Sequence, residues 1–179
     1  MNELSELPDI NTLERALPSM DGNGNLPVGD YAPSESEFMN RLVATDNPEK
    51  RGEIYEGWLR HGEALRNAGL SYQARQLLNG SYTTSKALPG DIDIAVEVAT
   101  DKDVPEFVIE NPTIMSLLQG PSMKMEYHCD AYPILVLPKT HPNYETVTVA
   151  AIKYWSKWFG RDRENREKGR VWALTGTHP

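Results

Sequence analysis

Acidic and aliphatic residues alternate in the segment from Asp91 to Val98, which reads DIDIAVEV. Side chains two residues apart on a β-strand point to the same face of the sheet, so Asp91 and Asp93 are expected to lie side by side near one end of a strand. Two close carboxylates repel each other, and each raises the pKa of the other unless a cation lies between them. Mg²⁺ suits such a pair because it binds carboxylate oxygens together with the phosphates of a substrate. The spacing therefore predicts a divalent-cation site.

Gly80 and Ser81 follow a short strand that the sequence predicts over residues 75–78. A glycine lets the backbone approach a phosphate group closely, and Ser81 offers a hydroxyl and an N–H group. A helical turn after Ser81 would direct further N–H groups toward an anion. The Gly-Ser pair is thus a predicted phosphate site that complements the predicted metal site.

Asp130 supplies a third carboxylate on a second predicted strand, residues 126–137. A buried acid is uncommon unless it is paired or bound to a metal. A third acid would complete a site for two metal ions and would help to deprotonate an attacking hydroxyl group. The competing interpretation is a tight turn followed by solvent-facing aspartates on an edge strand.

The surrounding pattern predicts a mixed domain in which helices pack on a small sheet. Residues 1–30 are rich in Pro, Gly, Asn and Asp, so we expect a partly irregular arm with a short helix at 10–16, followed by one domain over 31–179. Ser34 and Glu37 form a capping-box pattern that predicts the first helix of that domain. Further helices are expected at 47–69, 111–119 and 144–159, and a last strand at 170–174, with a polar break at 100–107.

The chain of 179 residues has a net charge of −8 and a pI of about 5.0, which argues against a general nucleic-acid coat protein. Residues 153–170 nevertheless hold seven bases against three acids. This stretch is either a solvated surface or an edge that faces phosphate or RNA. Within the last predicted helix, the stripe that contains Tyr154, Trp155 and Trp158 is expected to face the core rather than to form a base-stacking surface.

Several protein classes do not fit the composition. Cys129 is the single cysteine, so no internal disulfide is expected, and a reducing cytoplasm is the expected compartment. No apolar run is as long as a membrane span, and the first ten residues lack the apolar segment of a signal peptide.

Gly80-Ser81, the nine-residue gap after it, and Asp91-Ile92-Asp93-Ile94 together resemble the signature of the nucleotidyltransferase superfamily, which includes polymerase β and the minimal nucleotidyltransferases. The resemblance implies an α+β fold similar to the polymerase-β palm, with a small mixed β-sheet flanked by helices. It implies a nucleoside triphosphate substrate, two Mg²⁺ ions (with Mn²⁺ as a substitute) and in-line transfer of a nucleoside monophosphate to a hydroxyl group, with release of pyrophosphate.

Carried over by position, Asp91 and Asp93 hold the metals, Asp130 helps to ligate the metal that activates the acceptor, and Gly80-Ser81 holds the β- and γ-phosphates. Many minimal nucleotidyltransferases carry an Arg-Gly pair soon after Gly-Ser. This chain departs from that pattern, and Lys86 is the residue that can supply the positive charge. The segments NLPVGDYAPSESEF and REKGRVWAL resemble a poorly characterised bacterial branch, some of whose members lie near toxin–antitoxin or phage-defence genes.

Three functions follow as hypotheses. The first is an Mg²⁺-dependent nucleotidyltransferase that modifies a macromolecule, either a protein hydroxyl or an RNA 3′ end. The second is a catalytically silent binding module, such as an antitoxin or a nucleotide sensor, whose residues 1–30 contact a protein partner. The third is transfer to a small hydroxylated compound such as an aminoglycoside, whose positive charge would suit an acidic protein.

Overall fold

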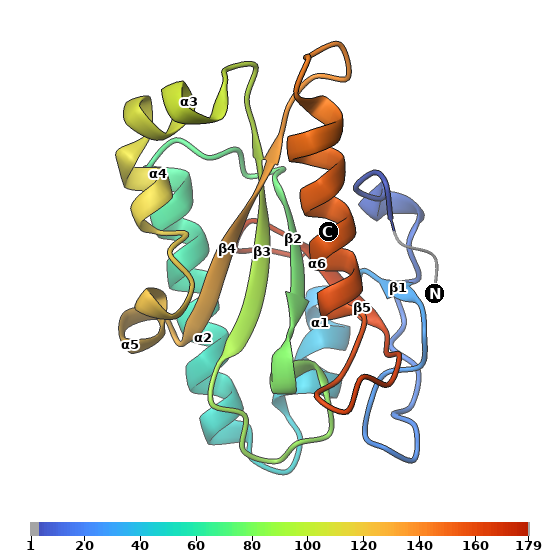
Figure 1. The fold of residues 1–179 in the computed structure, drawn as a ribbon. Coiled ribbons are helices and arrows are strands. Elements are labelled where there is room, and N and C mark those ends of the chain that lie inside the picture. The colour runs from blue at the N-terminus through green and yellow to red at the C-terminus, as the bar shows by residue number, and fades with distance from the viewer. Residues whose placement is uncertain (1–3, 179) are drawn as a thin grey trace.

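The computed structural model describes residues 4–178 and shows an α+β domain built on one five-stranded mixed sheet (Figure 1). The strands lie in the order β1-β5-β2-β3-β4. β3 is parallel to β4 and β1 is parallel to β5, whereas β2 is antiparallel to both of its neighbours. The strands are β1 (Asp30–Tyr31), β2 (Arg75–Asn79), β3 (Ile92–Ala99), β4 (Cys129–Val136) and β5 (Arg170–Leu174).

Helices cover the sheet and connect its strands. The helices are α1 (Glu35–Phe38), α2 (Pro48–Asn67), α3 (Val104–Glu110), α4 (Pro112–Ser116), α5 (Lys124–Tyr127) and α6 (Ala150–Phe159). Shorter 3-10 turns span Ile10–Thr12, Gly80–Thr83 and Pro121–Met123, and π-helical turns span Met39–Val43 and Tyr144–Val149. None of the helices within residues 4–178 is long and apolar enough to cross a membrane.

The local sequence explains where the first helices begin and end. The Ser34 hydroxyl accepts a hydrogen bond from the Glu37 N–H group at 3.3 Å, which confirms the predicted start of α1. Pro48 occupies the first turn of α2, where its missing N–H group has no intrahelical partner to lose. The chain leaves α2 at Gly69, whose φ of +101° is a conformation that favours glycine.

The two faces of the sheet pack on different helices. One face carries Ile94 and packs on α1 and α2, where Phe38 and Trp58 are fully buried. The opposite face carries Ala95 and packs on α6 through a cluster that includes Phe159. We call this second side the α6 face.

The segment before β1 lies against the domain within the described residues. Ile10, Leu17 and Leu26 are buried, and β1 pairs with β5. The Leu4 N–H group donates a hydrogen bond to the hydroxyl of Ser156 in α6, at 3.3 Å. The segment therefore covers part of the α6 side of the domain.

Several predictions of local structure are wrong in whole or in part, and the helix expected at 10–16 is only a 3-10 turn over Ile10–Thr12. The expected polar break at 100–107 contains the start of α3, whose Pro105 suits a first helical turn. The expected strand over 126–137 begins only at Cys129, because residues 124–127 form α5 and His128 adopts a left-handed conformation with φ of 53°. The expected core positions Tyr154 and Trp158 are 56% and 65% exposed.

Candidate active site

The three predicted metal-binding acids meet at one end of the sheet, where β2 ends and β3 and β4 begin (Figure 1). Asp93 lies directly opposite Asp130 in the parallel pair β3–β4, and opposite Asn79 in the antiparallel pair β2–β3. Neighbouring strands are about 4.8 Å apart, so the Asp93 and Asp130 side chains leave the sheet side by side. Strand alternation places both on the α6 face. Asp91 precedes the first residue of β3, Ile92.

Asp93 is held in an environment that disfavours its charge. Burial is the main cause that raises its pKa from the usual 3.8 to about 6, and the nearby carboxylates of Asp91 and Asp130 raise it further. Lys168 and Lys124 oppose this shift with their positive charges. A divalent cation between the carboxylates would remove the repulsion, so the electrostatics of the site favour cation binding.

Asp130 carries a polar atom that lacks a partner within the described residues. Its Oδ1 atom is buried and accepts no hydrogen bond. Burial, followed by the charge of Asp91, raises the pKa of Asp130, and Lys124 lowers it. A buried carboxylate oxygen without a partner is costly, and a hard cation is the partner that such an oxygen binds best. The acids therefore fit a Mg²⁺ or Mn²⁺ ion.

Lys124, at the start of α5, forms an ion pair with the Asp91 carboxylate. The contact with Asp91 raises the pKa of Lys124. Half of the Lys124 side chain is exposed, so the ammonium group can move away without opening the core. Across residues 4–178, no three His, Cys, Asp or Glu side chains already converge as a ready-made metal group. Asp91 instead directs its carboxylate to a lysine.

Gly80 allows the chain to turn directly beside Asp93. Its φ is +78°, and a Cβ atom at this position would collide with Oδ2 of Asp93. An alanine would thus be strained in its backbone and would press on the acid. Glycine is required here by both the conformation and the close approach. Ser81 follows in the 3-10 turn and is half-buried.

Lys168 brings a buried positive charge to the same place. Its side chain is 3% exposed, and its ammonium group donates a hydrogen bond to the Gly80 carbonyl at 3.1 Å. Burial lowers the pKa of Lys168 to about 8, and the charge of Asp93 opposes that shift. Lys168 thus links the Gly-Ser turn to the acidic cluster electrostatically.

Arg51 binds the backbone of the segment that follows Gly80-Ser81, residues 82–86. This side chain of α2 is 1% exposed, and it donates hydrogen bonds to the carbonyls of Tyr82 and Thr84 at 2.8 and 2.7 Å. A third donation reaches the carbonyl of Lys86 at 3.2 Å, and a fourth reaches Leu42 at 2.6 Å. Because these bonds go to backbone atoms, they fix the path of the loop whatever its side chains are.

Lys86 itself is exposed on that loop. Its backbone is bound by Arg51 and by the Thr84 hydroxyl. The structure brings Asp91, Asp93 and Asp130 together, while no contact joins the Lys86 side chain to them within the described residues. Lys168 and Lys124 are the cations that adjoin the acids.

The sequence indicates the role of one supporting residue, Arg51, more clearly than that of the other, Lys168. Arg51 lies three residues before Ile54 and seven before Trp58, so helical spacing places it on the buried face of α2. A charged residue on a buried face indicates that its charge has a structural or functional role. Lys168 is one of seven basic residues between positions 153 and 170, and no local pattern distinguishes it from the others. Arg170, in contrast, pairs with Asp30 at 2.7 Å and does not reach the site.

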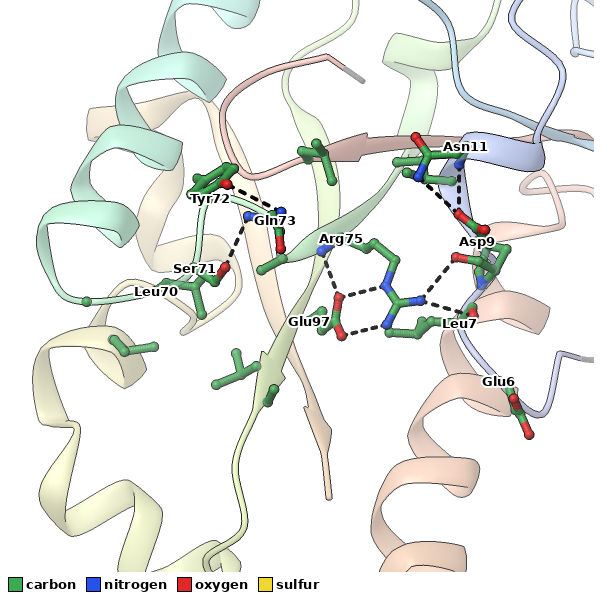
Figure 2. Close-up of a pocket in the computed structure, with 18 of the residues that line it drawn as sticks. Glu6, Leu7, Asp9, Asn11, Leu70, Ser71, Tyr72, Gln73, Arg75 and Glu97 are labelled. Carbon is green, nitrogen blue, oxygen red and sulfur yellow. Dashed lines mark hydrogen bonds and ion pairs between the residues drawn. The ribbon is translucent and has the colours of Figure 1, made fainter. Parts of the chain in front are cut away.

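A hollow lies at the opposite end of the sheet, with the ion pair of Arg75 and Glu97 at its centre (Figure 2). Arg75 donates to both oxygens of Glu97 and to the carbonyls of Leu7 and Pro8. Figure 2 shows these bonds converging on one guanidinium group. The charged groups at the centre of this hollow are therefore already paired with each other, so we place the functional site at the acidic end.

The comparisons with known proteins identify the family but not its activity. Residues 18–173 match a family of unknown function, DUF6932, and the chain belongs to that family. No curated protein and no solved structure matches the chain.

Proposed function

We propose that this protein is an Mg²⁺-dependent nucleotidyltransferase that transfers a nucleoside monophosphate to a hydroxyl group of a macromolecule. The observation that carries the proposal is the register that sets Asp93 opposite Asp130, with Asp91 and the Gly80-Ser81 turn beside them. A structural role does not explain this arrangement, since it raises the pKa of Asp93 and leaves an oxygen of Asp130 without a partner.

The fold supports the same class. The resemblance to polymerase β and the minimal nucleotidyltransferases implies a small mixed sheet with helices, with two acids at the start of one strand and a third acid on a later strand. β3 and β4 have these properties, and Gly80 lies at the end of the neighbouring β2. We therefore propose a polymerase-β palm-like domain.

Asp91, Asp93 and Asp130 would hold the metal ions. Bound Mg²⁺ would neutralise the charge of the triphosphate and lower the pKa of the acceptor hydroxyl. Asp91 would exchange the Lys124 ammonium group for an ion, and the unpartnered oxygen of Asp130 would gain a ligand bond.

The chain's own groups would position the triphosphate. Gly80 lets the chain turn tightly beside Asp93, and Ser81 would offer its hydroxyl and N–H groups to the phosphates. Lys168, which is hydrogen-bonded to the Gly80 carbonyl, would partly neutralise the negative charge of the triphosphate. Arg51 would fix the backbone of the loop after Gly80-Ser81.

The acceptor hydroxyl oxygen would attack the α-phosphorus while the bond to the β-phosphate oxygen breaks and pyrophosphate leaves. Asp130 would receive the proton of the hydroxyl group, because it is the third acid that the resemblance places beside the attacking hydroxyl. The proton would then pass to solvent.

The test is transfer of ³²P from each α-labelled nucleoside triphosphate to macromolecules of a cell lysate. We expect a labelled band with wild-type protein and Mg²⁺, and none with Asp93→Asn. Asp101→Asn is the matched control, since Asp101 is exposed beyond the far end of β3. Equal labelling by wild type and Asp93→Asn would refute the assignment.

The Lys124–Asp91 ion pair favours a second function, a silent binding module. A lysine that neutralises one acid permanently would let the fold bind a nucleotide or a protein without turnover. This function predicts that no nucleotide yields labelled product, although Mg²⁺-triphosphate binding remains measurable.

A further inference from the structure

The segment after β5 packs its last described side chain, His178, on a group of aromatic rings. The imidazole centroid lies 4.7 Å from the ring of Phe38, 5.3 Å from that of Trp58 and 6.1 Å from that of Tyr55. Phe38 and Trp58 are fully buried, and Tyr55 is buried as well. We call these three rings of α1 and α2 the aromatic seat. His178 covers part of its surface.

Backbone contacts bring the segment to this seat. Arg66 of α2 donates a hydrogen bond to the Thr175 carbonyl. Leu174 and Thr177 then exchange backbone hydrogen bonds at 3.1 and 3.2 Å, which close a turn. His178 follows directly after this turn, so its ring is the group that holds the end of the described segment on the aromatic seat.

The aromatic seat suits a neutral imidazole and disfavours a charged one. In an imidazolium ring both nitrogens carry a proton that needs an acceptor. Nε2 of His178 lies 3.4 Å from the Tyr55 hydroxyl, whereas Nδ1 is buried and has no hydrogen-bond partner within the described residues. Burial lowers the pKa of His178 to about 4, although the charge of Glu35 and the carbonyl of Pro33 oppose this shift. A protonated ring is therefore more stable in water than in the seat.

Two titratable groups of the packed helices face His178. Glu35 of α1 favours the imidazolium through its charge, but burial of the ring outweighs it. The Tyr55 hydroxyl of α2 lies 3.5 Å from the Glu35 carboxylate, and burial raises the pKa of Tyr55 to about 12. Tyr55 thus stays protonated at neutral and acidic pH, and His178 is the group whose charge changes with acidification.

The aromatic seat adjoins the candidate active site through one further ring. Phe38 stacks on Tyr82 with centroids 6.1 Å apart, and Tyr82 directly follows Ser81 in the 3-10 turn. The Tyr82 hydroxyl donates a hydrogen bond to the Arg51 carbonyl at 2.9 Å. A continuous series of ring contacts therefore extends from His178 to the Gly-Ser turn.

We propose that His178 is a pH-sensitive anchor: its neutral ring docks residues 176–178 on the aromatic seat, and its protonation releases them and uncovers Phe38. The inference concerns the conformation of this chain and does not rest on the proposed function. Because the docked pKa is about 4 against an ordinary 6.5, docking is strongest above pH 6.5 and weakens as the pH falls toward 4. Over that range the docking constant should fall roughly 100-fold.

The test is amide hydrogen exchange of the full chain, followed by NMR from pH 7.5 to 4 and corrected for the intrinsic exchange rate at each pH. The Thr177 N–H group, which bonds to the Leu174 carbonyl, reports docking, and the amides of β3 report global unfolding. The protection of Thr177 should fall roughly 100-fold, and that of β3 should change much less. The imidazole resonance of His178 should titrate well below pH 6.5.

His178→Phe separates the charge of the ring from its packing, because phenylalanine keeps an aromatic ring and binds no proton. Protection of Thr177 in this variant should not depend on pH. The matched control is His141→Gln, since His141 lies on the connection after β4, 3.5 Å from Asp103, and its loss should leave the wild-type response unchanged.

Three results would overturn the inference. The first is a wild-type protection of Thr177 that does not change between pH 7.5 and 4. The second is an equal fall in His178→Phe, which would assign the response to other groups. The third is a His178 resonance that titrates at the ordinary value of 6.5, which would show that the ring is not docked. The third result needs no variant, so it tests the inference even if His178→Phe folds poorly.

Discussion

Asp93→Asn should make the metal-free protein more stable at pH 8, even though it removes the central acid of the site. The folded pKa of Asp93 is about 6 against an ordinary 3.8, because burial and two nearby carboxylates disfavour its charge. The folded state therefore binds this proton more tightly than the unfolded state does. Stability due to Asp93 is greatest below pH 3.8, falls as the pH rises from 3.8 to 6, and stays low above 6.

The magnitude follows from the gap between the two pKa values. At 1.36 kcal/mol per pKa unit, a gap of about 2 units corresponds to about 3 kcal/mol of lost stability above pH 6. Asparagine has nearly the same shape and no charge, so it should recover most of this free energy. Partial solvent access and the attraction of Lys168 reduce the gain, and we expect about 1–3 kcal/mol.

The assay is urea unfolding of both proteins with EDTA between pH 4 and 8. The variant should be more stable at pH 8, and the difference should shrink toward pH 4. For a chain of this length the gain at pH 8 corresponds to about 2–4 °C of melting temperature per kcal/mol. Asp101→Asn should show no such effect. A variant that is less stable at pH 8, or a difference that does not change with pH, would refute the electrostatic argument.

Three more substitutions test the surroundings of the acids. Arg51→Met should lose about 3–5 kcal/mol in urea unfolding, because it leaves buried carbonyls without donors; a loss below 1 kcal/mol would contradict that role. Gly80→Ala should abolish label transfer and lower the melting temperature, since its Cβ atom collides with Asp93; normal transfer would show that the turn can relax. Lys124→Met should tighten Mg²⁺ binding several-fold in calorimetry, because a competing cation is gone; weaker binding would instead make Lys124 part of the site.

The sequence predicted the parts of the fold in which one pattern dominates. The alternation from Ile92 to Val98 predicts β3, with aliphatic residues on one face and Asp93 and Glu97 on the other. Ser34 and Pro48 gave the starts of two helices by local capping chemistry. The pairing of Asp93 with Asp130 required the register of two distant strands, which no local pattern contains.

The wrong prediction that Tyr154 and Trp158 of α6 face the core has a specific physical cause. Polar residues are buried on the sheet side, namely Ser156 in α6 and Thr148 in the π-helical turn before it. The Ser156 hydroxyl accepts from the Leu4 N–H group, and the Thr148 hydroxyl bonds to the backbone of Leu135 and Leu137. The exposed face of α6 carries Tyr154 and Trp158. The π-helical turn before α6 also changes the spacing on which a 3.6-residue pattern depends. In this helix, polar side chains are buried and large aromatic side chains are exposed. A prediction that assigns apolar residues to the core therefore fails here.

The most direct test of the central claim is a crystal structure of the protein grown with Mn²⁺ and a non-hydrolysable nucleoside triphosphate, with anomalous scattering used to locate the metal. We predict anomalous peaks bound by the carboxylates of Asp91, Asp93 and Asp130, with the triphosphate over Gly80-Ser81 and Lys124 displaced from Asp91. A nucleotide bound elsewhere, or a Lys124–Asp91 pair that persists with no peak at the acids, would contradict the account.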